Sequence, residues 1–227
     1  MTRKNLLSLT RVGMIGFLGF MLTGCKPDKL TLEIYSSDVE IAATGQEIIG
    51  VPVTAEFMLL GEDEEGVLDQ VIELSKKYLS PDSKYSKSKA MLGERLVIET
   101  KLPMTTFEGI EQSPARVAAL IVRPGETVKY RIDLMQTQNL ENFAEELQDI
   151  NLLLGLSLPA SETVIRVISD SRKTVKVKSI AVFVSKKPYL IFERDLNRRD
   201  SIDIVYPGGD GSVYSEIDPL IGIDFKQ

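Results

Sequence analysis

The sequence contains no histidine, no tryptophan and only one cysteine. Without histidine the chain cannot use a histidine general base, a Ser-His-Asp triad or a histidine metal ligand. One cysteine excludes an intrachain disulfide and a thiolate zinc cluster. These absences remove several common classes of enzyme, so we predict no catalytic residue, no bound metal and no cofactor.

The chain also has fewer basic than acidic residues. The chain has 27 Lys and Arg residues against 33 Asp and Glu residues, which gives a formal net charge of −6. Nucleic-acid binding needs a net basic face, so this balance argues against a nucleic-acid partner. Hydrophobic residues make up 43 % of the 227 residues, and this fraction is sufficient to build a folded core.

The first 24 residues differ in composition from the rest of the chain. Arg3, Lys4 and Arg11 supply positive charge, and no acidic residue accompanies them. Residues 12–22 (VGMIGFLGFML) include an uncharged apolar run of 11 residues. Such a run is typical of a signal-peptide core and is shorter than the roughly 20 residues that a membrane-spanning helix needs. We therefore expect residues 1–24 to be a signal peptide.

The apolar run ends in Leu22, Thr23, Gly24 and Cys25. This motif resembles the lipobox of bacterial lipoprotein precursors, with an apolar residue, two small residues and then cysteine. The resemblance implies that Cys25 is lipidated through a thioether and that lipoprotein signal peptidase recognises Leu22, Thr23 and Gly24. It also implies cleavage before Cys25 and acylation of the new N-terminus. Two or more acyl chains make membrane attachment durable.

The residue after Cys25 is Lys26 rather than aspartate. In enteric-type bacteria this resembles lipoproteins that are released to the outer membrane, which implies an outer-membrane anchor and a periplasmic location. Residues 25–29 provide the lipidated cysteine and a short tether, and four extended residues reach roughly 13 Å. We expect residues 30–227 to form a single compact domain close to the membrane surface.

The periodicity of apolar residues predicts a mixed α+β fold. Alternation of apolar and polar residues predicts strands at 30–35, 51–60, 94–102, 127–135, 162–169, 174–185, 189–193 and 201–206. Apolar residues at helical spacing predict two main amphipathic helices, at 64–79 and 139–154. The polar residues 80–89 are expected to form a loop. The predicted fold is an antiparallel-rich sheet with both helices packed on one face.

The order strand–helix–strand occurs twice, at residues 51–102 and again at 127–169. Two interpretations of this pattern remain open. The chain could consist of two similar β-α-β halves, residues 30–110 and 115–227, that arose by duplication. Alternatively, the match reflects only the spacing that any two amphipathic helices share.

Charge is distributed unevenly along the mature chain. Residues 30–75 contain 11 acidic residues and no Lys or Arg, whereas residues 164–199 contain 10 basic and 3 acidic residues. One interpretation is that these two segments neutralise each other across the fold. The other is that the basic segment contacts phospholipid headgroups or an acidic partner. The candidate contact residues are Arg172, Lys173, Lys176, Lys178, Lys186 and Lys187.

Two short segments carry residue types that occur in binding sites. Residues 62–65 (EDEE) offer carboxylates, but they lack the ligand spacing of a calcium loop and are better explained as charge at a helix start. Residues 206–212 (YPGGDGS) are rich in glycine, but no Lys-Ser/Thr pair follows as in a P-loop. We expect a turn there.

The predicted function follows from the anchor, the short tether and the uneven charge. We expect a membrane-anchored, non-catalytic lipoprotein that binds another envelope component, protein or lipid, as an adaptor, assembly factor or exclusion factor. One alternative is a carrier of lipid or of a small apolar ligand between the sheet and the helices. A second alternative is a hydrolase of envelope glycans that uses two carboxylates instead of histidine.

Overall fold

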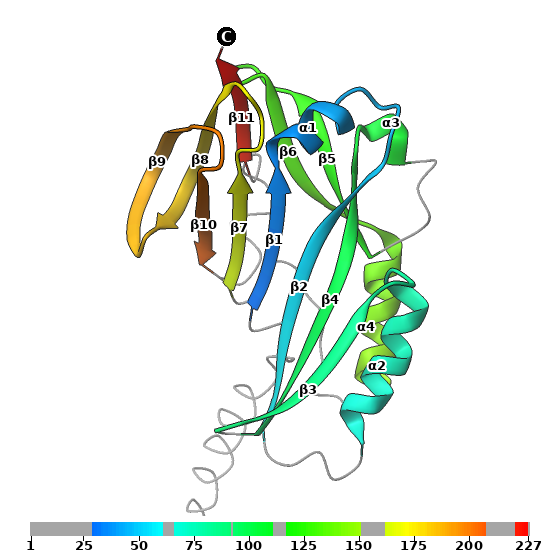
Figure 1. The fold of residues 1–227 in the computed structure, drawn as a ribbon. Helices are drawn as coiled ribbons and strands as arrows, with labels where there is room; N and C mark the ends of the chain where they lie inside the picture. Colours follow the sequence, from blue (N-terminus) through cyan, green and yellow to red (C-terminus); the bar gives the residue numbers. More distant parts are fainter. Residues whose placement is uncertain are drawn as a thin grey trace, which may run out of the picture.

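The computed structural model describes residues 29–60, 66–91, 93–110, 117–150, 162–207 and 221–226. The helices in these ranges are α1 (Ser36–Ala42), α2 (Val67–Tyr78), α3 (Phe107–Ile110) and α4 (Gln138–Ile150). The strands are β1 (Lys29–Tyr35), β2 (Ile49–Leu60), β3 (Lys84–Ala90), β4 (Gly93–Thr105), β5 (Ala118–Pro124), β6 (Tyr130–Gln136), β7 (Glu162–Ile168), β8 (Thr174–Val184), β9 (Lys187–Leu196), β10 (Ser201–Pro207) and β11 (Ile221–Lys226). Figure 1 shows these strands curving round a common interior.

Nine of the strands close into a barrel. Their order is β10-β7-β1-β2-β4-β5-β6-β11-β8, and β8 returns to β10 through the pairs Ile204↔Val184 and Val205↔Phe183. Outside this ring, β3 pairs with β4 and β9 pairs with β8. The predicted α+β class, with two main amphipathic helices on one face of a sheet, is therefore wrong. The described chain is mostly strand, and its helices are short.

This error has a physical cause. Alternating apolar and polar residues show that one face of a strand is buried, and residues alternate in this way both in a barrel and in an open sheet. The contacts that close the ring join distant parts of the chain, since β1 pairs in parallel with β7, with Lys29 opposite Glu162. No pattern within either strand identifies the other as its partner.

The two strand–helix–strand units differ in how their strands pair. In the first unit, β2 and β3 flank α2 along the chain, and both pair with β4, which lies between them. The strands that flank α4 in the second unit are β6 and β7, and they are not neighbours. Instead, β6 pairs with β5 and β11, whereas β7 pairs with β1 and β10. The two helices therefore sit in different sheet contexts.

The barrel interior is filled by branched aliphatic side chains from neighbouring strands. Leu32 lies opposite Ile165, and Ile165 lies opposite Ile204, so one row of side chains crosses three adjacent strands. All three are fully buried. Burial of such side chains supplies most of the free energy that stabilises the fold. The alternating apolar residues that predicted strands at 30–35, 162–169 and 201–206 therefore form the inward face of the barrel.

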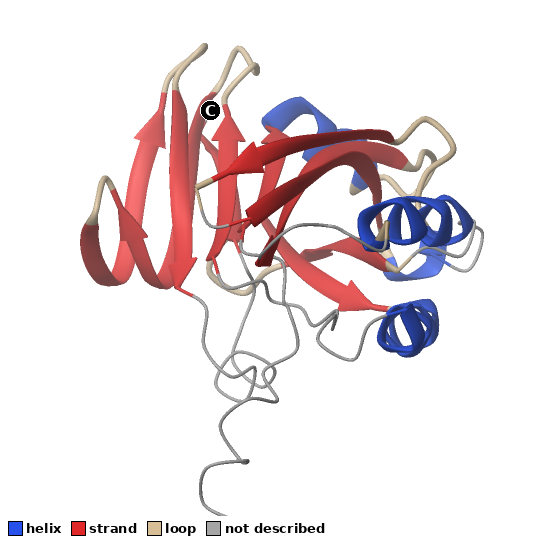
Figure 2. Cartoon of the chain, turned by 90° about the horizontal axis from the view of Figure 1, so that it is seen from below, coloured by secondary structure: helices blue, strands red, loops and turns tan. Residues whose placement is uncertain are grey.

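The two longer helices lie against each other and against the inner face of the sheet. The Tyr78 ring of α2 stacks on the Phe143 ring of α4, with centroids 5.0 Å apart. Lys77 and Tyr78 both donate hydrogen bonds to Glu146. Figure 2, viewed from below, shows both helices grouped on one side of the strands. Both occur where the periodicity predicts them, but residues 84–90, expected in a loop, form β3.

Several sequence predictions fall outside the described ranges. The signal peptide, the lipobox residues Leu22, Thr23 and Gly24, and Cys25 itself all lie there, as do residues 62–65 and most of the glycine-rich segment. Within the described ranges, none of the helices has both the length and the apolar character needed to cross a membrane. The same ranges contain no cluster of three or more metal-binding side chains.

Candidate interaction surface

The hairpin of β8 and β9 carries four of the candidate contact residues. Its two strands pair from Val175↔Leu196 to Val184↔Lys187, so that Ser185 and Lys186 alone connect them. These two residues have φ values of +49° and +64°, as a two-residue type I′ turn requires. Among the described strands β9 has one neighbour, β8. β8 therefore stays in the ring, and β9 lies outside it at the end of the sheet.

The outer part of this hairpin, residues 179–192, is here named the hairpin tip. Ala181 has a φ of +51° and interrupts the pairing between Ile180↔Ile191 and Val182↔Tyr189. Positive φ is uncommon for a residue with a side chain and indicates a local deformation of the strand. The buried face of β8 changes at this point, because Ser179 is buried before Ala181 and Val182 is buried after it.

The hairpin tip exposes a group of large apolar side chains. Leu190 is 81 % exposed, Ile191 70 %, Tyr189 38 % and Phe183 37 %. Beneath them Phe192 is buried and meets Tyr189 edge to face, with ring centroids 5.3 Å apart. Single exposed apolar residues are common on protein surfaces, but several on one hairpin are typical of an interaction surface.

Three of the six candidate basic residues are neutralised within the fold. Lys176 and Lys178 lie 3.5 Å and 3.2 Å from the carboxylate of Glu193, near the base of the hairpin. The hydrogen bond from Lys178 is the main reason why the pKa of Glu193 lies below its ordinary value. Lys173 lies 3.3 Å from Glu40 of α1. Of these three residues, only Lys173 has its partner in the acidic segment 30–75 and so agrees with neutralisation between the two segments; Lys176 and Lys178 are neutralised from within the basic segment.

The other three candidate basic residues are not neutralised in this way. Arg172, Lys186 and Lys187 form no ion pair with any part of the chain that the structure describes. Residues 179–192 contain two lysines and no Asp or Glu. The hairpin tip therefore combines positive charge with exposed apolar side chains, whereas its base is electrically balanced.

A hollow of about 490 Å³ lies against the hairpin tip. Its lining includes the carboxylate of Glu193, which pairs with Lys176 and Lys178, and four further residues: Lys187, Tyr189, Ile191 and Arg194. Two basic side chains next to aromatic and aliphatic ones provide contacts for an anionic group that carries an apolar body. Of these four residues, the sequence analysis proposed only Lys187 as a contact.

The position of the hairpin tip follows from the strand register. Thr31 of β1 lies opposite Val164, Val164 opposite Val205, and Val205 opposite Phe183. Phe183 and Thr31 therefore lie in one row, separated by three steps between neighbouring strands. With a spacing of about 4.8 Å per step, the two residues are about 14 Å apart along the sheet. Figure 1 shows the β8–β9 turn on the same side of the barrel as the start of β1, away from α1. The tip therefore lies at the same end of the barrel as Lys29, the first residue of β1.

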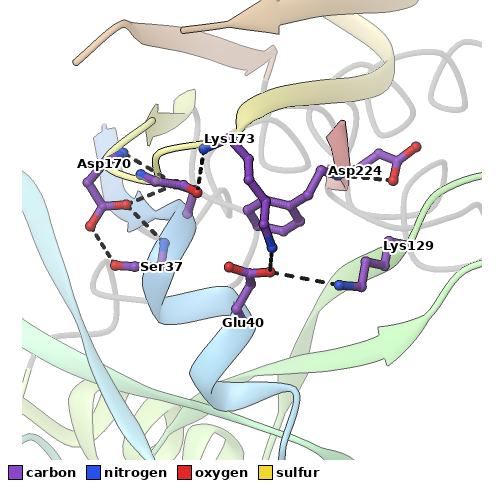
Figure 3. A network of polar contacts seen from close by, with 9 residues as sticks. Ser37, Glu40, Lys129, Asp170, Lys173 and Asp224 are labelled. Carbon is purple, nitrogen blue, oxygen red and sulfur yellow. Dashed lines mark hydrogen bonds and ion pairs between the residues drawn. The ribbon is translucent and has the colours of Figure 1, made fainter. Parts of the chain in front are cut away.

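A second polar cluster lies at the opposite end of β1, where α1 begins (Figure 3). Asp170, in the loop between β7 and β8, accepts hydrogen bonds of 2.9 Å from the Ser36 hydroxyl and from the backbone N–H of Ser37. It also accepts a bond from the Ser37 hydroxyl. Although burial opposes the shift, these bonds lower the pKa of Asp170 below its ordinary value of 3.8. A carboxylate distant in sequence therefore caps α1.

Removing this cap gives a testable loss of stability. We expect Asp170→Ala to lower the free energy of unfolding by about 1 kcal/mol at pH 7, the usual contribution of a helix cap. Because the folded-state pKa is depressed, the contribution is complete above pH 3.8 and is lost as pH falls through the folded-state value. Urea unfolding of both proteins between pH 7 and about pH 2.5 measures the difference.

Asp38 in the same helix is a matched control with the opposite sign. Burial, and then repulsion by Asp170, raise the pKa of Asp38. The charged form is therefore disfavoured in the folded state, and Asp38→Asn should become more stable relative to the wild type as pH rises. An Asp170→Ala variant as stable as the wild type at pH 7 would contradict the capping role.

Asp38 and Asp170 also bear on the alternative of a carboxylate hydrolase. One carboxyl group has a raised pKa and the other a lowered one, as an acid and base pair has. However, both oxygen atoms of Asp170 accept hydrogen bonds from Ser36 and Ser37. Its carboxylate is thus engaged in holding α1, and this observation favours a structural role for the pair.

The alternative of a lipid carrier depends on space between the helices and the sheet. An apolar cavity does lie there, lined by residues that include Val53, Ile98, Leu140 and Phe143. Its volume is about 60 Å³. Ligand pockets usually measure roughly 300–1,000 Å³. The cavity is far smaller than a lipid, so the geometry favours the hairpin tip as the candidate site.

The residues that sequence reasoning missed are Leu190, Ile191 and Arg194. Leu190 and Ile191 belong to an apolar run directly after Lys186 and Lys187, and this combination was the available signal. The sequence predicted a strand at 189–193, and a strand pattern does not show which of its apolar residues stay exposed. No protein-family model, no curated protein and no solved structure matches this chain.

Proposed function

We propose that the protein is a non-catalytic bacterial lipoprotein that binds another envelope component through the hairpin tip. In this proposal lipidated Cys25 anchors the chain in the outer membrane, and the barrel faces the periplasm. The observation that carries the binding role is the group of exposed apolar side chains around Leu190 and Ile191. A group of this kind on the surface of a folded domain is typical of an interaction site.

The location of these side chains supports a specific contact. β9 ends the sheet, and unprotected end strands tend to pair with other chains. Its first residues are Lys187 and Pro188, and both residue types discourage such pairing. The tip can therefore present apolar side chains without a strong tendency to extend the sheet at random. That combination suits an adaptor.

Photocross-linking in living bacteria tests the proposal. A photoreactive amino acid in place of Leu190, in the full-length chain, should give a defined adduct with an envelope component. The matched control is Phe107 of α3, which is 60 % exposed. α3 follows the C-terminal end of β4 and lies near α1, away from the β8–β9 turn (Figure 1). We expect no defined adduct from position 107. Equal products from both positions, or none from position 190, would count against the hairpin tip as the binding surface.

A further inference from the structure

We propose that the component bound by the hairpin tip is the anionic surface of the bilayer in which Cys25 is anchored. The inference rests on the proposed function and names its partner. Leu190 and Ile191 enter the interfacial region of the bilayer, and Lys186 and Lys187 contact the phosphate groups of anionic lipids. The hairpin is then a second membrane contact, and together with the lipid it holds the barrel in one orientation.

The charge pattern of the hairpin favours a lipid surface. Lysines at the base are neutralised by Glu193, but the two lysines of the tip form no ion pair with the described residues. Lysine next to exposed apolar side chains is the pattern of segments that lie in a membrane interface, where the charged end reaches the headgroups. β3 is also rich in lysine, but the hairpin tip places its lysines beside four exposed large apolar side chains.

The distance to the anchor also fits. Cys25 precedes Lys29 by four residues, which reach at most about 13 Å. Phe183 of the hairpin tip lies in the row of Thr31, about 14 Å across three strands. A bilayer that holds acyl chains on Cys25 is therefore within reach of the tip. A partner elsewhere in the periplasm would have no such fixed relation to the tether.

The hollow beside the tip has the chemistry of a headgroup site. Lys187 and Arg194 line it together with Tyr189 and Ile191, and the one carboxylate among its lining residues, Glu193, is paired with Lys176 and Lys178. Basic side chains bind a phosphate, and the apolar side chains next to them suit the glycerol and the upper acyl chain. An acidic protein segment would pair with the lysines but would offer no apolar contact for Leu190 and Ile191.

The test uses the lipidated protein in vesicles of phosphatidylcholine, with or without phosphatidylglycerol. The sequence has only one cysteine, and lipidation occupies its sulfur, so Leu190→Cys introduces the sole free thiol. A polarity-sensitive fluorophore at this position is quenched by spin-labelled lipid if the tip enters the bilayer. Phe107→Cys carries the same probe at the control position.

We expect strong quenching at position 190 in vesicles that contain phosphatidylglycerol and little quenching at position 107. Lys186→Glu with Lys187→Glu should lower the ratio of docked to undocked hairpin at least about 25-fold, since each lysine contributes roughly fivefold near an anionic surface. Raising the salt concentration from about 0.05 to 0.5 M should weaken docking in the same direction.

Three results would overturn the inference: no quenching at position 190, equal quenching at positions 190 and 107, or the same quenching without phosphatidylglycerol. The photocross-linking experiment separates this failure from that of the proposed function. A protein adduct from Leu190 without lipid quenching leaves the binding role intact and makes the partner a protein. The absence of both an adduct and quenching removes the binding role as well.

Discussion

Replacing Cys25 by serine should leave the chain as an unlipidated precursor that retains residues 1–24. Only a thiol accepts the diacylglyceryl group, and in the lipoprotein pathway that the lipobox implies, cleavage depends on this modification. Each buried methylene contributes about 0.8 kcal/mol to membrane binding, so the loss of several acyl chains is an all-or-none change. Labelling with palmitate, intact mass and membrane fractionation would each measure it.

Lys26→Asp is the matched control for this experiment. It leaves Cys25 and the lipobox unchanged, so the variant should be labelled and cleaved as the wild type is. If the residue after the cysteine directs sorting as in enteric-type bacteria, the variant should collect in the inner membrane. Full palmitate labelling of Cys25→Ser would contradict the anchor and would remove the basis for the proposed membrane orientation.

Truncating Leu32 should produce the second large effect, a loss of about 2–5 kcal/mol in the free energy of unfolding. Leu32 is fully buried in the row that crosses β1, β7 and β10. Leu32→Ala removes apolar contacts and leaves a cavity that a closed barrel cannot easily fill by relaxing. Because a domain is stable by only about 5–15 kcal/mol, the loss should be plain in urea unfolding.

Leu190→Ala provides a control with the same chemical change. Its side chain is mostly exposed, so the variant should unfold within about 0.5 kcal/mol of the wild type. Together the two variants separate the structural role of a leucine from its role at the surface. A cost below about 1 kcal/mol for Leu32→Ala would mean that the barrel interior is not packed round this side chain.

The sequence predicted individual elements better than their arrangement. Alternation identified β1, β7 and β10, and helical spacing identified α2 and α4, because each pattern records one buried face. β3 was missed because it has no such face: its residues are KYSKSKA, and it pairs only with β4. Closure of the barrel was missed because it depends on pairs such as Leu32↔Ile165 and Val205↔Phe183, which no local pattern encodes.

The candidate surface was predicted only in part, again because a local pattern does not show which strands pair. The basic character of residues 164–199 was evident, but the sequence could not separate Lys176 and Lys178, which pair with Glu193, from Lys186 and Lys187. That distinction depends on the register that places Glu193 opposite Lys178. The exposure of Leu190 likewise depends on the position of β9 outside the ring.

The place of β11 in the ring determines when the protein can finish folding. β11 follows every other strand in the chain, yet it lies between β6 and β8 and pairs with both. Until residues 221–226 have been synthesised, β6 and β8 lack this shared neighbour and the ring stays open. Strand pairs between distant parts of a chain also form slowly. Newly synthesised molecules therefore pass through a period in which the edges of β6 and β8 are unpaired and can pair with other chains, and a chaperone would act during that period.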